Sequence, residues 1–366
     1  MIDDFQSSEG FFQQSIALSL GYLYYNEVTL LNVSLNCLLS IVSSKTVVEC
    51  RLNAYESLSK LYTSCTSQQH TILQTLYNGL WDYSMDQRGD VGAWIRQSCA
   101  KGLTICLSEN VEPSFVDKVV SRLVGISLDN IYTSRWVAIE ELENMIDKKL
   151  INDTQTTNSL RDFFYNTRKD TEDVYSSTKI FEHVVTLYQQ ESKLRDDILM
   201  GLGLALISKN EISVYNSRMA ILGLADNLLD DVVKRSIMLS ESNTKTSFFT
   251  GLANTLFVVL DERDVCCDDL SEIVAFNSKY CQKSKVINRI TIGMKIVATL
   301  FYKYDYQAAK KSLIQYLTHS LPRIRAITAE EVYIQSQVYD GDQGLLDWLM
   351  DIDWLGKNLP AAEVKL

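Results

Sequence analysis

DQRGDVGAWIR, at residues 86–96, combines a polar turn with the first residues of a helix. Asp90 is a good candidate for the helix N-cap, because its carboxylate can accept hydrogen bonds from first-turn amides and favours the positive end of the helix dipole. We expect this helix to run from about Val91 to Leu107. Its apolar residues at helical spacing are Trp94, Ile95, Cys99, Leu103 and Cys106. A turn followed by such a helix is typical of one unit of a helical repeat.

Segments on both sides of this helix have the same helical spacing of apolar residues. We expect helices at about 68–83, 113–127 and 131–150, and further helices along the second half of the chain. The 366 residues include 3 prolines and 15 glycines, so few residues interrupt these patterns. The sequence therefore predicts an all-α fold with no more than incidental strands.

A repeated arginine marks several of the expected helices. Four arginines each lie a few residues ahead of a small alanine: Arg51, Arg96, Arg135 and Arg325. The first three are 45 and 39 residues apart, which is the period of helix-pair repeats of the HEAT or armadillo type. We therefore predict a HEAT/armadillo-like helical-repeat solenoid. In such an array the alanine lets paired helices approach, and the arginine reaches an acid or carbonyl group of a neighbouring repeat.

One polar stretch divides the chain. Residues 152–178 include NDTQTTN and RKDTEDVYSST, with few apolar side chains to oppose the loss of backbone entropy. We expect a linker or long loop there, partly disordered. This expectation gives a helical-repeat segment at 1–151 and a second one at 179–366, in which a last helix from 343 to about 355 caps the array.

The composition argues against several classes of function. A net charge of −11 does not suit a nucleic-acid-binding protein, which needs a basic face. The longest apolar run, residues 198–207, is about half of what a membrane span requires. The 8 cysteines lack metal-ligand spacing, and no glycine-rich phosphate loop, zinc motif or catalytic triad motif occurs. We therefore expect a cytoplasmic protein with reduced thiols, without a cofactor, a metal site, catalytic residues or a membrane span.

Three segments resemble the tubulin-folding cofactor D family, also called tubulin-specific chaperone D. The first is RGDVGAWIR at 88–96, and the second is LPRIRAITAEEVYIQ at 321–335. The third is LLDWLMDIDW at 345–354, which matches a leucine-rich segment ending in an aspartate–tryptophan pair. Order and spacing agree from about residue 69 to 354. Members of this family are much longer, so the chain is expected to be a C-terminal fragment or an unusually short relative.

The resemblance implies a function in tubulin folding. Members of the family take part in late tubulin folding and in assembly of the α/β-tubulin heterodimer. They bind β-tubulin, work with cofactor E and an Arf-like small GTPase, and contribute to the stimulation of GTP hydrolysis. By resemblance, this chain supplies helical-repeat surface for those contacts and is cytoplasmic and associated with the cytoskeleton. The alternative is a generic HEAT-like binding scaffold in another cytosolic pathway.

The turn at 86–90 holds the candidate partner-binding residues Asp86, Arg88 and Asp90. An exposed Arg88 could stabilise a phosphoryl-transfer transition state as an arginine finger, or it could pair with a neighbouring aspartate and shape the turn. We favour the second interpretation. Trp94 is expected in the core rather than as a partner anchor, and Arg96 is expected to join neighbouring repeats, like Arg135 and Arg325.

Overall fold

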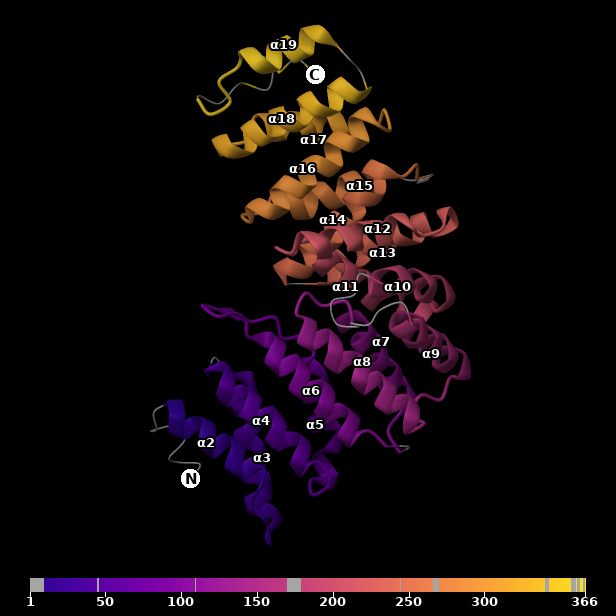
Figure 1. The fold of residues 1–366 in the computed structure, drawn as a ribbon. Coiled ribbons are helices and arrows are strands. Elements are labelled where there is room, and N and C mark those ends of the chain that lie inside the picture. The colour runs from indigo at the N-terminus through magenta and orange to yellow at the C-terminus, as the bar shows by residue number, and fades with distance from the viewer. Residues whose placement is uncertain are drawn as a thin grey trace. The chain divides into compact units, whose positions relative to one another are not determined.

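The structure, a computed structural model, describes most of the chain. The described residues are 10–44, 46–108, 110–169, 179–243, 245–265, 270–339, 342–356, 360, 363, 364 and 366. Within them, 18 α-helices and one pair of two-residue strands are found (Figure 1). The predicted all-α fold is therefore confirmed. The chain divides into two compact units, unit 1 at Met1–Ser177 and unit 2 at Thr178–Leu366.

Unit 1 is built from helix pairs. Its elements are α2 (Gly10–Leu20), α3 (Val28–Ser43), α4 (Val48–Leu61), α5 (Gln69–Gly79), β1 (Met85–Asp86), β2 (Gly89–Asp90), α6 (Gly92–Cys106), α7 (Pro113–Ile126), α8 (Tyr132–Asp147) and α9 (Thr154–Lys169), with a 3-10 turn at Thr66–Gln68. Helices α2, α4, α6 and α8 pack side by side in chain order (Figure 1). Helices α3, α5 and α7 pack against α4, α6 and α8 respectively, which gives two layers consistent with helical repeats.

Apolar side chains and small residues hold these pairs together. In α6, Ile95, Cys99 and Leu103 are fully buried, as their helical spacing predicts. Burial of Ile95 or of Leu103 stabilises the fold by roughly 1.5–3 kcal/mol. The alanines that follow the repeated arginines in unit 1 are also buried, at Ala54, Ala100 and Ala138. They allow the close approach of neighbouring helices that the sequence predicts.

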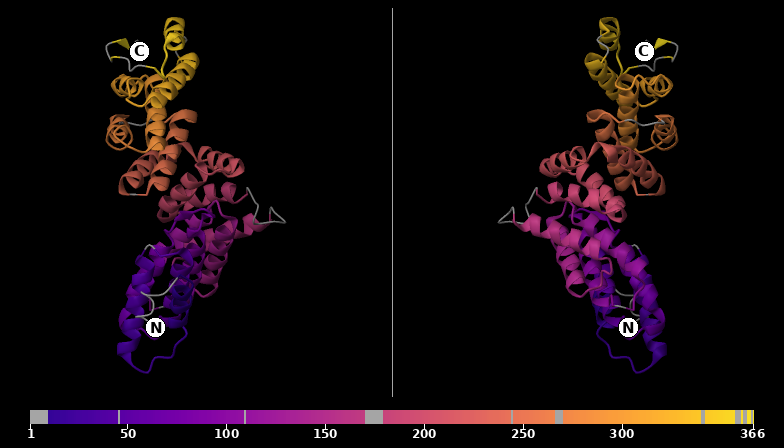
Figure 2. Two further views of the ribbon diagram at one scale, coloured as in Figure 1. Left: turned by 90° about the vertical axis from the view of Figure 1, so that its left-hand side faces the viewer. Right: turned by 90° about the vertical axis from the view of Figure 1, so that its right-hand side faces the viewer.

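Unit 2 has a similar layered arrangement. Its elements are α10 (Lys179–Gln190), α11 (Arg195–Leu206), α12 (Glu211–Leu222), α13 (Leu229–Ser242), α14 (Thr246–Glu262), α15 (Leu270–Phe276), a π-helical turn (Asn277–Cys281), α16 (Ile287–Tyr302), α17 (Ala309–Leu317), α18 (Pro322–Tyr339) and α19 (Gln343–Asp351), with 3-10 turns at Ser192–Leu194 and Asp226–Leu228. Helices α11, α14, α16 and α18 pack side by side in that order, and α12, α13, α17 and the π-helical turn pack against them. The colour order in Figure 2 shows that the helices of each unit are stacked along the chain.

The polar stretch at 152–178 differs from its expectation. Residues 154–169 form helix α9, so the prediction of a loop over these residues is wrong. Asp153 begins the helix by accepting hydrogen bonds from the amides of Gln155 at 2.9 Å and Thr156 at 3.4 Å. The buried face of α9 consists of Thr156, Ser159, Leu160, Phe163, Phe164 and Thr167. Two threonines and a serine on this face hide the apolar periodicity in the sequence. Residues 170–178 of the expected linker lie outside the described residues.

The last helix that the sequence predicts is also found in the structure. Helix α19 ends at Asp351, a few residues before the expected end, and packs on α18. Asp342 caps its start by accepting hydrogen bonds from two first-turn amides. Among the described helices, none is both long enough and apolar enough to cross a membrane.

Candidate functional site

The polar turn before α6 is a small β-hairpin. Met85 pairs with Asp90 and Asp86 with Gly89 in antiparallel register. The Asp86 carboxylate accepts a hydrogen bond from the amide of Arg88 at 2.7 Å, which closes the tip. Gly89 has a φ of 109°, a conformation that favours glycine. The hairpin is therefore fixed by local chemistry that the turn residues supply.

Asp90 has a different role from the one its sequence suggests. Helix α6 begins at Gly92, its N-cap is Val91, and no side chain caps it. Asp90 lies in strand β2, and its carboxylate accepts a hydrogen bond from Arg96 Nη2 at 2.8 Å. The prediction that Asp90 is the N-cap is wrong, because the hairpin extends through this residue and directs it to the guanidinium.

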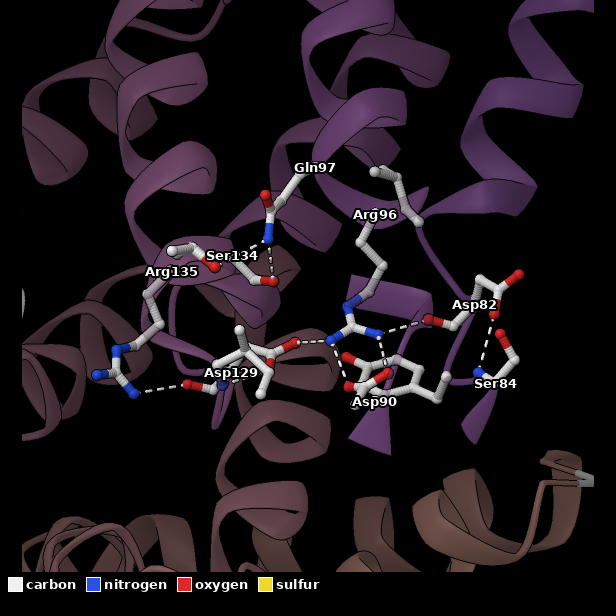
Figure 3. A network of polar contacts seen from close by, with 12 residues as sticks. Asp82, Ser84, Asp90, Arg96, Gln97, Asp129, Ser134 and Arg135 are labelled. Atoms are coloured by element: carbon white, nitrogen blue, oxygen red, sulfur yellow. Dashed lines mark hydrogen bonds and ion pairs between the residues drawn. The ribbon is translucent and has the colours of Figure 1, made fainter. Parts of the chain in front are cut away.

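Arg96 is the centre of a buried polar network (Figure 3). The residue is 1 % exposed, and its guanidinium lies 3.9 Å from the centroid of the Tyr83 ring. Its Nη1 donates to the backbone oxygen of Asp82 at 2.5 Å, and its Nη2 forms an ion pair with Asp129 at 2.8 Å. Since Asp129 lies in the turn before α8, Arg96 joins α6 to the turn of the next helix pair.

Asp129 also organises the start of α8. Its carboxylate accepts a hydrogen bond from the amide of Ile131 at 2.9 Å, and its backbone oxygen accepts one from Arg135 at 2.7 Å (Figure 3). Gln97 of α6 donates to the hydroxyl of Ser134 at 3.2 Å. Two neighbouring residues of α6 thus hold the beginning of α8.

Arg51 of α4 repeats this arrangement one helix pair earlier. Its guanidinium forms an ion pair with Asp82 at 2.5 Å and donates to Ser84 Oγ at 3.0 Å. Burial acts to raise the pKa of Asp82, but hydrogen bonds from Ser84 and the charge of Arg51 outweigh it and lower that pKa. In unit 1, Arg51 and Arg96 each bind the aspartate in the turn before the next helix of the layer formed by α2, α4, α6 and α8.

Arg325 occupies a corresponding position in unit 2. It is 2 % exposed and lies in the first turn of α18. It donates to the backbone oxygens of His319 at 2.9 Å, Trp354 at 3.2 Å and Gly356 at 2.5 Å. Arg325 therefore fastens the segment after α19 to the start of α18.

Arg88 of the hairpin and Trp94 of α6 are both exposed and lie next to each other. Arg88 forms ion pairs with Asp86 at 2.6 Å and with Glu49 of α4. Hydrogen bonds from Arg88 lower the pKa of both carboxyl groups. Trp94 is 38 % exposed, and the guanidinium of Arg88 lies 4.9 Å from its ring centroid. The prediction that Trp94 is a core residue is wrong, because Ile95 takes the inward position in the first turn of α6.

A groove begins beside Trp94. It lies between α4 and α6, has a volume of about 520 Å³, and is called here the α4–α6 groove. Its lining includes Leu52, Lys60, Trp94, Lys101 and Ile105. Ile105 is 70 % exposed, which is unusual for an isoleucine in the middle of a helix layer. The hairpin and this groove together form a surface with an exposed aromatic ring, an oriented arginine and aliphatic side chains.

Sequence reasoning missed several residues of this region. Asp82 and Asp129 bind the buried arginines, and they could have been found by aligning the turns before α6 and α8. Glu49 of α4, which binds Arg88, has no such signal in the sequence. Arg122 is also fully buried, lies 3.9 Å from the Trp81 ring centroid, and donates to Tyr83 Oη at 2.8 Å. In the sequence, Arg122 could have been recognised as the single charged residue within the mostly apolar run VVSRLVGI.

Cys99, the thiol nearest to the hairpin in sequence, is fully buried, and burial raises its pKa well above the usual value. Across the described ranges, no cluster of three or more histidine, cysteine, aspartate or glutamate residues could hold a metal ion. Comparison with protein families and with curated proteins finds no match for this chain.

Proposed function

We propose that this chain is a protein-binding helical-repeat module of the HEAT/armadillo-like solenoid type that acts in tubulin folding. By its resemblance to the cofactor D family, its partners are β-tubulin, cofactor E and an Arf-like small GTPase. It works in the cytoplasm in association with the cytoskeleton, and contributes to GTPase activation. Support comes from the segments 88–96, 321–335 and 345–354, which carry the resemblance.

The observation that carries the binding role is the exposed pair of Arg88 and Trp94 beside the α4–α6 groove. Arginine and tryptophan are enriched among the residues that dominate protein–protein binding energies. Asp86 and Glu49 hold the Arg88 side chain in one orientation, so less conformational entropy is lost when a partner binds. The surface is thus pre-organised for a protein partner.

The paired state of Arg88 favours docking over an arginine finger. A finger places an uncompensated guanidinium against transferring phosphate oxygens. In this chain two carboxylates accept hydrogen bonds from that guanidinium. A contribution to GTP hydrolysis is therefore assigned to positioning of the GTPase, with Arg88 as a binding residue.

Binding assays with purified proteins test this proposal. The chain is immobilised and exposed to α/β-tubulin, and separately to Arf-like GTPases in their GTP and GDP forms. We expect Arg88→Ala and Trp94→Ala to weaken capture of at least one partner, whereas Arg161→Ala, which removes an exposed arginine of α9, leaves capture unchanged. Failure of the unaltered chain to bind either partner would favour the generic scaffold instead.

A further inference from the structure

Unit 2 contains a second groove, on the layer formed by α11, α14, α16 and α18. The groove has a volume of about 690 Å³, and all four helices contribute residues to its lining. We call it the α14–α18 groove. Its polar lining residues include Thr250 and Asn254 of α14, and its apolar ones include Phe257 and Ile327. Two of its lining residues, Arg323 and Ile327, lie in the segment at 321–335.

The charged residues in the groove's lining are both basic. They are Lys295 of α16 and Arg323 of α18, in a chain whose net charge is −11. Within the described part of the chain, Arg323 is exposed and forms no ion pair. Lys295 lies 3.8 Å from Glu331, whose other oxygen accepts a hydrogen bond from Gln335. An ammonium group has three donors, so Lys295 can bind a further acceptor.

The helix ends add positive potential to the same groove. The first residues of α14 and α16, Thr246 and Ile287, line it together with Arg323 in the first turn of α18. Helix N-termini attract anions, and acidic residues usually occupy their first turns. None of these three first turns contains an acidic residue, and no side chain caps α14 or α16. The groove is thus electrostatically suited to carboxylates.

We propose that the α14–α18 groove binds an acidic peptide segment of a partner protein. Carboxylates of the peptide pair with Arg323 and Lys295, and a bulky apolar side chain packs on Phe257 and Ile327. The apolar lining and the volume favour a peptide over a small anion, which would leave these side chains uncovered. This inference is independent of the tubulin assignment, because it rests on the lining of one groove in unit 2.

Fluorescence anisotropy with synthetic peptides tests the proposal. The probe is a labelled peptide in which glutamates flank a leucine–phenylalanine pair, titrated with the full chain. One comparison peptide replaces the glutamates with glutamines, and another replaces the apolar pair with serines. We expect both replacements to weaken binding, and we expect inorganic phosphate at millimolar concentration to leave the probe bound.

Two substitutions locate the site. Arg323→Gln should weaken binding of the probe about tenfold, as the loss of a charge-assisted hydrogen bond implies. Lys311→Gln removes one exposed positive charge of α17 outside the groove and should leave binding unchanged.

Other results would overturn the proposal. Equal weakening by Arg323→Gln and Lys311→Gln would show non-specific attraction to positive charge. Equal binding of the glutamine peptide would exclude recognition of carboxylates. Displacement of the probe by phosphate would show a small-anion site. Because Arg323 is exposed, its variant should fold, and circular dichroism of each variant checks this.

Discussion

The turn before α6 and the turn before α18 each lead to a buried arginine, and the two guanidinium groups are satisfied differently. Arg96 forms ion pairs with the carboxylates of Asp90 and Asp129. Arg325 donates to backbone oxygens in its own turn and in the segment after α19. A buried arginine near the start of a helix is therefore held by a charge-compensated network in unit 1 and by a group of backbone carbonyls, the carbonyl cage, in unit 2.

This difference predicts how strongly each unit depends on its arginine. Removal of Arg96 leaves two carboxylates facing each other without a cation, one of them on the buried Asp129. Removal of Arg325 leaves uncharged carbonyl groups, one of them on the exposed Gly356, where water can replace part of the lost bonding. A buried uncompensated charge destabilises a fold more than an unpaired carbonyl does.

The largest effect is therefore expected for Arg96→Ala. The free energy of unfolding of unit 1 should fall by about 3–5 kcal/mol, the range for breaking a buried pair by removing one partner. Urea denaturation followed by circular dichroism measures it. The double variant with Asp129→Asn should recover part of the loss, because it removes a stranded charge. A loss below about 1 kcal/mol for Arg96→Ala would contradict the buried network.

Arg325→Ala should have a smaller effect, about 2–3 kcal/mol in unit 2. Trp354 is mostly buried, and its backbone oxygen accepts from Arg325, so the variant should also loosen this tryptophan. A red shift of tryptophan emission below the unfolding transition reports that change. Arg323→Ala is the matched control, since that neighbouring arginine is exposed and should leave the emission unchanged. Equal behaviour of the two variants would argue against the carbonyl cage.

The carbonyl cage also predicts a pH dependence at His319. Burial and the nearby charge of Arg325 lower the pKa of His319, and its Nδ1 accepts a hydrogen bond from the amide of Leu321 at 3.0 Å. The unfolded chain binds this proton more readily, so the stabilisation is complete above a pH of about 6.5 and is lost as the pH falls through the folded pKa. Unfolding of unit 2 measured between neutral and mildly acidic pH tests this. His319→Gln, which keeps an acceptor, should flatten that part of the profile.

The sequence predicted the helices of unit 1 better than their first turns. The helix expected at Val91–Leu107 is observed at Gly92–Cys106, because its apolar spacing is long and regular. Asp90 and Trp94 were misplaced because their surroundings depend on residues distant in sequence. The hairpin places the Asp90 carboxylate beside Arg96. Trp94 contacts Arg88, whose guanidinium is also bound by Glu49 of α4.

Helix α9 shows a second reason for error. Its buried face includes Thr156 and Thr167, and Thr167 Oγ1 donates to the backbone oxygen of Phe163 at 2.7 Å. A threonine that bonds its own helix can be buried, yet it counts as polar in a sequence pattern. The two grooves could not be predicted either, since each is lined by side chains from helices that are separate in sequence.

The smallest effect on stability is expected for Arg88, which is ion-paired like Arg96 but is exposed. Its ion pairs with Asp86 and Glu49 are screened by water, and exposed pairs contribute little to folding. Arg88→Ala should leave the melting temperature unchanged within measurement error, in contrast to Arg96→Ala. It should nevertheless weaken partner capture, because the guanidinium beside Trp94 is lost from the exposed surface. A lower melting temperature with normal capture would make Arg88 a structural residue of the hairpin, and the binding surface of unit 1 would then lie elsewhere.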